Sequence, residues 1–159
     1  MSINFKDQFI KIAISKQYKI KQPSFVQKKN NIDLILEGQQ SGKPVFVSVD
    51  IKKKNRKDSN NWVYIEFQNS KGKEGWLYGD ADFIVFETKQ SFIFVPRKSL
   101  INHLSANQIV RWDLPFVDKP WNCKNRLFRR PKTNEIITQI NTRELLSVPN
   151  HKIWKKPKS

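Results

Sequence analysis

The chain is poor in the residues that build most metal and nucleophile sites. Its 159 residues include one cysteine, Cys123, and two histidines, His103 and His151, which lie far apart in the sequence. A single cysteine excludes an intramolecular disulfide and an all-cysteine metal site within one chain. The isolated histidines give no support for zinc fingers, zinc hydrolases or His-Asn-His nucleases. No glycine-rich loop ends in Gly-Lys-Ser/Thr, which excludes an ordinary ATPase.

Long apolar runs are also missing from the sequence. No segment approaches the ~20 apolar residues that a membrane-spanning helix needs, and the first residues lack the layout of a signal peptide. We therefore expect a cytoplasmic protein that does not enter a membrane. Hydrophobic residues make up 38% of the chain and aromatic residues 12%, which is enough to bury a core in one domain.

Acidic residues are scarce relative to basic ones. Fourteen Asp and Glu residues stand against 30 Lys and Arg residues, and the formal net charge is +16. A surplus of this size indicates a polyanionic partner, with nucleic acid as the first candidate. A second explanation stays open, because an AT-rich genome produces a lysine-rich protein without any functional pressure. On that explanation the protein has a structural or interaction role.

The spacing of apolar residues predicts an α/β chain. Residues 4–16 have the period of an amphipathic helix, and residues 97–104 have that of a second, shorter helix. Between these helices the period is that of strands, with glycines at the turns. The strands are expected over residues 32–36, 45–51, 62–67, 83–86 and 92–95.

The last third of the chain is basic and interrupted by prolines. Residues 105–159 hold 12 basic and 4 acidic residues, and only residues 135–146 have a helical period. We interpret residues 1–104 as the core and residues 105–159 as a basic extension packed on it. Arg126, Arg129 and Arg130 are the side chains of this extension that we expect to contact DNA phosphates. The alternative is a structural wrap that packs its tryptophans on the sheet.

Acidic side chains interrupt three of the expected strands. Asp33 opens the first strand, Asp50 lies in the second and Glu66 in the third. Alternation along a strand puts Asp50 and Lys52 on one face, and it puts Glu66 and Gln68 together on one face of the next strand. If these strands are neighbours, the five side chains converge at one end of the sheet.

Such a cluster suits the hydrolysis of phosphodiester bonds. Carboxylates bind Mg²⁺, or Mn²⁺ as a substitute, and the metal polarises the phosphate and lowers the pKa of a water. A neighbouring lysine orients that water or stabilises the developing charge. We therefore predict Asp33, Asp50 and Glu66 as metal ligands, with Lys52 and Gln68 completing the catalytic set. The alternative is that each acid pairs with a lysine at a strand end.

The densest basic run of the chain follows directly after this pattern. It would place Lys53, Lys54, Arg56 and Lys57 beside the scissile phosphate, and we predict that these residues bind nucleic acid. A solvated loop is the alternative. Further along, Asp82 is expected to anchor the start of a strand.

The order of the acids and the lysine resembles the motif of the PD-(D/E)xK nuclease superfamily. Asp33 is followed, after sixteen intervening residues, by Asp50-Ile51-Lys52. The family includes Holliday-junction resolvases, restriction enzymes, homing endonucleases and phage nucleases. The resemblance covers residues 4–104, and it implies a restriction-endonuclease-like α/β core around a mixed sheet. On this sequence it assigns the metal-binding acids to Asp33 and Asp50 and the lysine to Lys52.

The activity that the resemblance implies is that of a Mg²⁺-dependent endonuclease of phage or mobile-element origin. It would cut duplex or branched DNA as a homodimer or higher homo-oligomer, because cutting both strands usually needs two sites. A second frame also fits the motif, since fifteen residues separate Asp50 from Glu66-Phe67-Gln68, with Gln in place of Lys. We prefer the first frame because it keeps the lysine. The rival function is a nucleic-acid-binding protein without catalysis.

Overall fold

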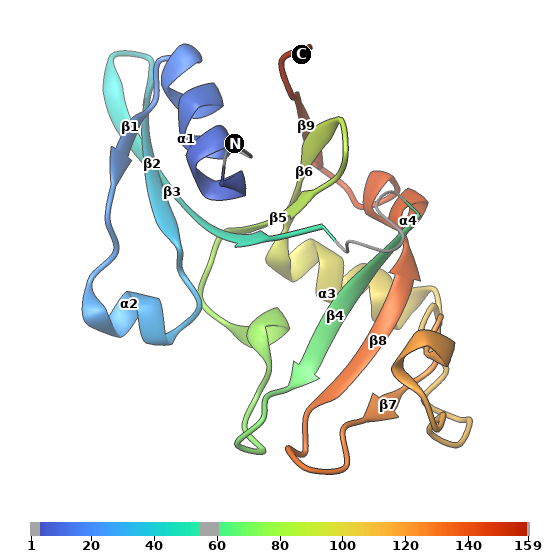
Figure 1. Ribbon diagram of the computed structural model, residues 1–159. Coiled ribbons are helices and arrows are strands. Elements are labelled where there is room, and N and C mark those ends of the chain that lie inside the picture. Colours follow the sequence, from blue (N-terminus) through green and yellow to red (C-terminus); the bar gives the residue numbers. More distant parts are fainter. Residues whose placement is uncertain (1–3, 55–60, 159) are drawn as a thin grey trace.

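A computed structural model describes residues 4–54 and 61–158 and shows two β-sheets with four α-helices around them (Figure 1). The larger sheet has the strand order β1-β2-β3-β5-β6-β9, and the smaller sheet has the order β4-β8-β7. The strands are β1 Lys19–Lys21, β2 Leu34–Gln40, β3 Lys43–Lys52, β4 Trp62–Gln68, β5 Phe83–Glu87, β6 Ser91–Pro96, β7 Phe128–Arg129, β8 Ile136–Asn141 and β9 Lys152–Lys155. The α-helices are α1 Phe5–Ser15, α2 Phe25–Lys29, α3 Arg97–Ala106 and α4 Thr142–Leu146. No helix within these described ranges is long and apolar enough to cross a membrane.

The larger sheet is mixed. Its neighbouring strands are antiparallel except for β3 and β5, which run parallel where Val49–Lys52 pairs with Phe83–Phe86. A parallel pair needs a crossover connection, which in most proteins is a helix. Here the connection between β3 and β5 carries β4 and a short 3₁₀ helix, η1 Trp76–Tyr78. Strand β4 does not belong to the larger sheet; it pairs with β8 in the smaller one.

The expected strands and the two helices expected within residues 4–104 all form, but one strand lies in a different sheet. The expected convergence of the acids required the strand carrying Glu66 to lie beside the strand carrying Asp50, and these two strands are not neighbours. The place beside the end of β3 is taken by β5. Ile65 and Phe67 of β4 are buried against Ile84 on the face of the larger sheet, so β4 packs on that sheet instead of joining it.

The end of the chain differs more from expectation. The predicted helix over residues 135–146 is instead strand β8 followed by helix α4. Ile136, Ile137 and Ile140 are β-branched residues, which favour strands, and Ile137 is buried in a different cluster from the other two. Strand β9 was not expected, and it adds to β6 with Trp154 buried. Strands from beyond residue 104 therefore pair with strands from before it.

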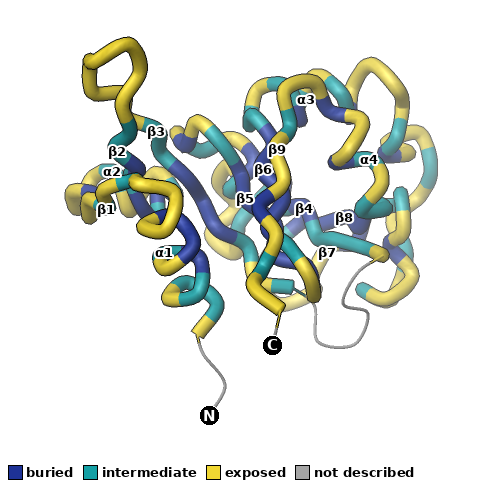
Figure 2. Tube along the Cα trace, turned by 90° about the horizontal axis from the view of Figure 1, so that it is seen from above, coloured by how far each residue is buried: buried dark blue, intermediate teal, exposed yellow. Residues whose placement is uncertain are grey.

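Helix α1 covers one face of the larger sheet with its apolar stripe. Phe9 is fully buried, with its ring 5.4 Å from that of Phe92 and 5.3 Å from that of Trp154. The opposite face of β5 and β6 packs on the smaller sheet and on α3 and α4. Viewed from above in Figure 2, the buried parts of β3 and β5 run through the middle of the molecule, and the exposed tip of the β2–β3 hairpin projects from one side.

This layering gives the two faces of β3 different surroundings. Val49 and Ile51 are buried under α1. Alternation turns Asp50 and Lys52 to the other face, toward the side where the smaller sheet packs. Because β3 lies between β2 and β5 in the sheet, pairing on both sides fixes the position of the Asp50 backbone.

We predict that the contact between α1 and the sheet stabilises the fold strongly. Replacing Phe9 with Ala removes a fully buried ring and should lower the free energy of unfolding by about 3–5 kcal/mol, measured by urea denaturation. Ile14→Ala in the same helix is the matched control, because Ile14 is 58% exposed and its loss should change stability by less than about 0.5 kcal/mol. Equal effects of the two substitutions would contradict this packing.

Candidate functional site

A tight two-residue turn brings two acids into register. Ser41 and Gly42 connect β2 to β3, and both have positive φ, as a type I′ hairpin turn requires. The register pairs Leu34 with Val49, so one step further along the hairpin Asp33 lies across from Asp50. The spacing of the two acids is therefore set by their equal distance from the turn.

Asp33 continues the hairpin beyond the last paired residues. Its backbone N–H donates to the carbonyl of Val49 at 2.9 Å, and its Oδ2 accepts from the N–H of Ile51 at 2.8 Å. The second oxygen, Oδ1, lies 3.3 Å from Nζ of Lys6 on α1. These contacts, from β3 and from α1, fix the Asp33 carboxylate beside β3.

Asp50 is a buried acid in the larger sheet. It is 3% exposed, and its direct neighbour on β5 is Ile84. Its Oδ1 lies 3.0 Å from Nζ of Lys52, while its Oδ2 has no hydrogen-bond partner among the described residues. Buried polar atoms without a partner are rare in proteins, because leaving one unpaired is costly. The unpaired oxygen is a place where a ligand would be favourable.

The surroundings of Asp50 disfavour its charged form. Burial raises the pKa of Asp50 to about 7. The ammonium of Lys52 opposes this rise, while the negative charge of the neighbouring Asp33 carboxylate raises the pKa of Asp50 further. Two neighbouring carboxylates of this kind are stable only with a proton or a cation between them.

Glu66 reaches the same region from the smaller sheet. Its Oε1 accepts from the backbone N–H of Trp76 at 3.1 Å. Burial raises the pKa of Glu66, and the hydrogen bond from Trp76 and the charge of Lys52 act in the opposite direction. The Nζ of Lys52 also lies 4.4 Å from the ring centre of Trp76. Lys52 therefore lies between the Asp50 carboxylate on one side and Trp76 with Glu66 on the other.

Trp76 is a residue of this site that the predicted set of site residues did not include. Its position depends on Gly75, whose N–H donates to the carbonyl of Phe67 at 2.8 Å. A side chain at position 75 would overlap the backbone of Glu66 and Phe67, so only glycine permits this close approach. The pair Gly75-Trp76 just after a strand was the available signal.

Gln68 does not join the other predicted residues. A β-bulge between Glu66 and Gln68 shifts the register of β4, and the Gln68 amide donates to the carbonyl of Asn134 at 2.7 Å. The Gln68 side chain thus stabilises the turn that precedes β8. Of the two frames in the sequence, the structure assembles Asp33, Asp50 and Lys52.

The donors present fit a hard cation held by two carboxylates. No group of three or more Asp, Glu, His or Cys side chains that could hold a metal ion is found in residues 4–54 and 61–158. The hairpin register brings Asp33 and Asp50 together, and Glu66 is not grouped with them among the described residues. An unpaired carboxylate oxygen beside a second carboxylate is the donor chemistry that Mg²⁺ and Mn²⁺ bind.

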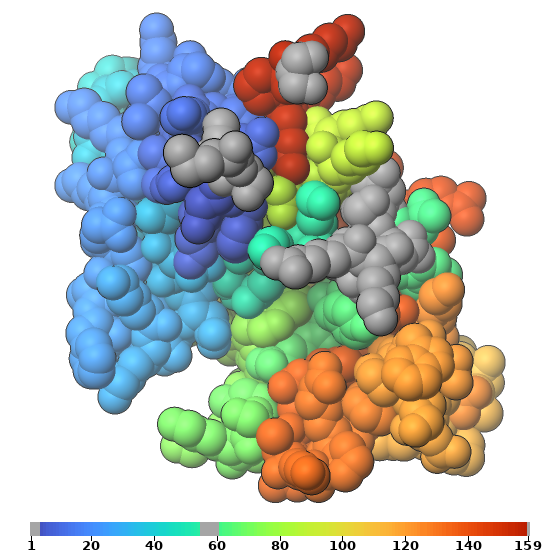
Figure 3. All heavy atoms as spheres, viewed as in Figure 1, coloured from blue at the N-terminus to red at the C-terminus, as the bar shows by residue number. Residues whose placement is uncertain are grey.

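The basic run that begins at Lys53 follows β3 directly, close in the sequence to Asp50. The backbone N–H of Lys54 donates to Oε1 of the buried Glu87 at 3.1 Å, and Oε2 of Glu87 lies 2.8 Å from Nζ of Lys156. Lys53 and Lys54 border a cavity of about 250 Å³ together with Lys52. The predicted Arg56 and Lys57 lie outside the described residues. On the face shown in Figure 3, the end of β3 lies between the N-terminal elements and the C-terminal segment.

The three predicted arginines of the C-terminal segment make local contacts. Arg126 donates to the carbonyl of Pro115 at 2.7 Å, and the Nε of Arg130 lies 3.3 Å from Oε1 of Glu135. The guanidinium of Arg129 lies 5.4 Å from the ring centre of Phe116. All three contacts lie within the C-terminal segment itself. Contact of these arginines with DNA stays a prediction.

Asp82 anchors a strand, as expected. Its Oδ2 accepts from the N–H of Ser48 at 2.9 Å, and its own N–H donates to Oγ of Ser48 at the same distance. The bonds tie the start of β5 to β3 immediately before Asp50. They support the parallel pairing on which the position of Asp50 depends.

No protein-family model matches the chain, and comparison with curated proteins and with solved structures finds no match either. The resemblance to PD-(D/E)xK nucleases therefore depends on the residues of the sequence motif alone and stays a prediction.

Asp50 should make the stability of the protein depend on pH in the absence of divalent metal. Its pKa in the fold, about 7, lies above the ordinary value of 3.8, so the folded protein binds this proton more tightly than the unfolded chain does. The resulting stabilisation is complete below about pH 4 and is lost as the pH rises through about 7. Denaturation in EDTA across this range measures it.

Asp50→Asn should remove most of this pH dependence and should be the more stable protein at pH 8. Asp118→Asn, at an exposed position, is the control and should follow the wild type. A wild-type profile that Asp50→Asn leaves unchanged would show that Asp50 is not held in the described environment.

Proposed function

We propose that the protein is a Mg²⁺-dependent endonuclease that hydrolyses phosphodiester bonds in DNA at Asp33, Asp50 and Lys52. The observation that carries the proposal is the Asp50 carboxylate. It is buried, it contacts Lys52 through one oxygen, and its other oxygen has no partner although a second carboxylate lies beside it. In an ion pair with only a structural role, both oxygens of the buried carboxylate are expected to have hydrogen-bond partners.

Asp33 and Asp50 would hold the metal ion. A bound Mg²⁺ supplies Lewis acidity at the phosphate and a lower pKa for the attacking water. The chain contributes a rigid ligand pair, since Asp33 is fixed by the N–H of Ile51 and Asp50 is fixed within the sheet. Because both carboxylates are held before the substrate arrives, little reorganisation is needed.

Lys52 would act on the phosphate. Its ammonium lies between the Asp50 carboxylate and the Trp76 ring, and its side chain is 26% exposed. From this position it would donate a hydrogen bond to a phosphate oxygen and stabilise the negative charge that develops during hydrolysis. The contacts with Asp50 and Trp76 limit the conformations of its long side chain.

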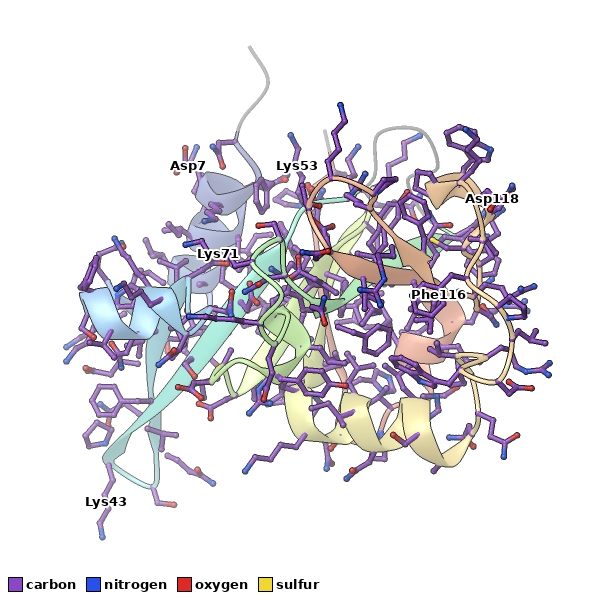
Figure 4. The ribbon with its side chains drawn as sticks, turned by 90° about the horizontal axis from the view of Figure 1, so that it is seen from below. Asp7, Lys43, Lys53, Lys71, Phe116 and Asp118 are labelled. Carbon is purple, nitrogen blue, oxygen red and sulfur yellow. The ribbon has the colours of Figure 1, made fainter. Side chains whose placement is uncertain are left out.

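The surrounding cations would hold the DNA backbone over the site. Lys53 and Lys54 follow Lys52 directly, and the chain as a whole carries a net charge of +16. Figure 4 shows Lys53 far from Lys43, which lies at the tip of the β2–β3 hairpin. Phosphate contacts of this kind position the DNA without reading its sequence.

The chain order also supports a restriction-endonuclease-like core. Helix α1 is followed by the β2–β3 hairpin, with Asp33 directly before β2 and Asp50-Ile51-Lys52 in β3, then by further strands and a helix, around a mixed sheet. We include in the proposal a homodimer or higher homo-oligomer acting on duplex or branched DNA, since cutting both strands needs two sites.

Loss of either charged partner should abolish cleavage. Asp50→Asn and Lys52→Ala should each lower the rate of plasmid nicking in Mg²⁺ by at least ~10²-fold, because each removes a group that stabilises the transition state. DNA binding, measured by anisotropy in Ca²⁺, should persist.

Asp118→Asn is the control and should cut at the wild-type rate. Cleavage that survives both site substitutions would rule out this site. Binding by the wild type without any cleavage would favour the rival, non-catalytic function.

Lys53 should contribute to DNA affinity through a phosphate contact. Lys53→Ala should reduce the slope of log affinity against log salt concentration by about 0.9, the value for one phosphate contact on duplex DNA. Lys43→Ala, an equal change of charge at the hairpin tip, should leave the slope unchanged. Equal slopes for the two variants would show that binding depends only on net charge.

A further inference from the structure

The β2–β3 hairpin extends beyond the rest of the molecule. Its tip consists of residues 39–46, and every one of them is exposed. None of these residues belongs to a hydrophobic cluster of the core. Figure 2 shows the tip projecting from one side, whereas Asp50, toward the other end of the hairpin, is buried. The hairpin is therefore an arm that is fixed near the two acids and free at its tip.

The tip carries groups that recognise the edges of base pairs. Gln39 and Gln40 present amide groups, and Lys43 points away from the rest of the molecule in Figure 4. Val45 and Phe46 add exposed apolar surface, at 37% and 50% exposure. In the major groove of DNA, glutamine pairs with adenine, lysine with guanine, and apolar side chains contact the methyl group of thymine. The tip combines all three kinds of group.

The charge of the hairpin fits a polyanion. No acidic residue occurs between Glu37 and Asp50. The Glu37 side chain is only 14% exposed, and its carboxylate lies 3.3 Å from Nζ of Lys21 and 4.0 Å from Nζ of Lys19. Lys19 is largely exposed, so the strand beside the tip presents positive charge. A second copy of this chain is a less favourable partner, because its own net charge is +16.

We infer that the tip of the β2–β3 hairpin enters the major groove of duplex DNA and contacts the edges of base pairs there. The inference rests on the proposed function and specifies its substrate as a duplex with a preferred sequence. The major groove is about 12 Å wide and admits a two-stranded ribbon, whereas the minor groove is only about 6 Å wide. Lys43 would meet base edges and no phosphate, as the salt dependence expected for Lys43→Ala requires.

The length of the hairpin limits how far from the catalytic acids the bases are read. Lys43 and Asp50 are seven residues apart in β3. A strand rises about 3.4 Å per residue, so the tip lies about 24 Å from Asp50 along the strand. This distance corresponds to about seven base pairs of B-DNA at about 3.4 Å each. The recognised bases should therefore lie within one helical turn, about 10 base pairs, of the bond that is cut.

The test selects bound sequences from a pool of DNA duplexes with a random central segment. Binding takes place in Ca²⁺, so that no cleavage intervenes, and the bound fraction is sequenced. The wild type should enrich a preferred sequence and bind it about 5- to 150-fold more tightly than its single-base variants, the range for one paired contact with a base. A pool without any enriched sequence would overturn the inference without any mutation.

Substitutions at the tip show whether the hairpin produces this preference. Gln39→Ala and Gln40→Ala, combined in one variant, should bring the affinity ratio at the contacted base pairs close to one. Gln90→Ala is the matched control, because Gln90 is an exposed glutamine at the turn between β5 and β6. A preference that the double variant retains in full would place the reading of bases elsewhere and overturn the inference.

Base analogues in the preferred sequence identify the groove. Replacing an adenine with 7-deazaadenine removes N7, an acceptor in the major groove, and should weaken binding at a contacted position. Replacing it with 3-deazaadenine removes N3, an acceptor in the minor groove, and should leave the affinity unchanged. Weakening by the second analogue alone, or by neither analogue at any adenine of the sequence, would overturn the inference.

The Asp50→Asn variant separates this inference from the proposed function, because it keeps the tip and lacks the catalytic acid. It should enrich the same sequence as the wild type. Enrichment by a wild-type protein that never cuts DNA would contradict the proposed function and leave the inference standing. In Mg²⁺ the wild type should cut within one helical turn of the preferred sequence. Cuts spread evenly along the DNA would contradict the inference alone.

Discussion

A carboxylate kept out of water, with one of its oxygens unpaired, is the feature on which the rest of this structure depends. Asp50 lies in the larger sheet between Asp33 on the hairpin partner and Ile84 on the parallel strand. Burial of a charge is unfavourable unless something compensates for it, and Lys52 compensates for only one of the two oxygens. The parallel pairing of β3 with β5, anchored by Asp82 and covered by α1, forces the acid into this position.

Lys52 connects the two sheets at the site. On one side it contacts Asp50, and on the other it lies over Trp76, whose backbone binds Glu66 of the smaller sheet. Because β4 pairs with β8 and does not join the larger sheet, Glu66 stays apart from the two acids.

The features that depend on local sequence were predictable. Strand alternation placed Asp50 and Lys52 on one face, and the acids of the first frame meet because a two-residue turn lies midway between them. Features that depend on distant pairing were not predictable. Glu66 was expected beside Asp50, but β4 instead pairs with β8, some seventy residues later in the chain, and a bulge there turns Gln68 toward Asn134. The strand at residues 136–141 was mistaken for a helix because its isoleucines fit either period, and only burial on both faces decides the matter.

The central claim is that Asp33 and Asp50 together form a site for a divalent metal ion. The most direct measurement is a crystal structure of the protein soaked in Mn²⁺, with the ion located by its anomalous scattering. The account predicts one Mn²⁺ bound by the carboxylates of Asp33 and Asp50, with Lys52 beside it. A Mn²⁺ ion bound by Asp50 and Glu66 without Asp33, or no ion at these carboxylates at saturating Mn²⁺, would contradict it.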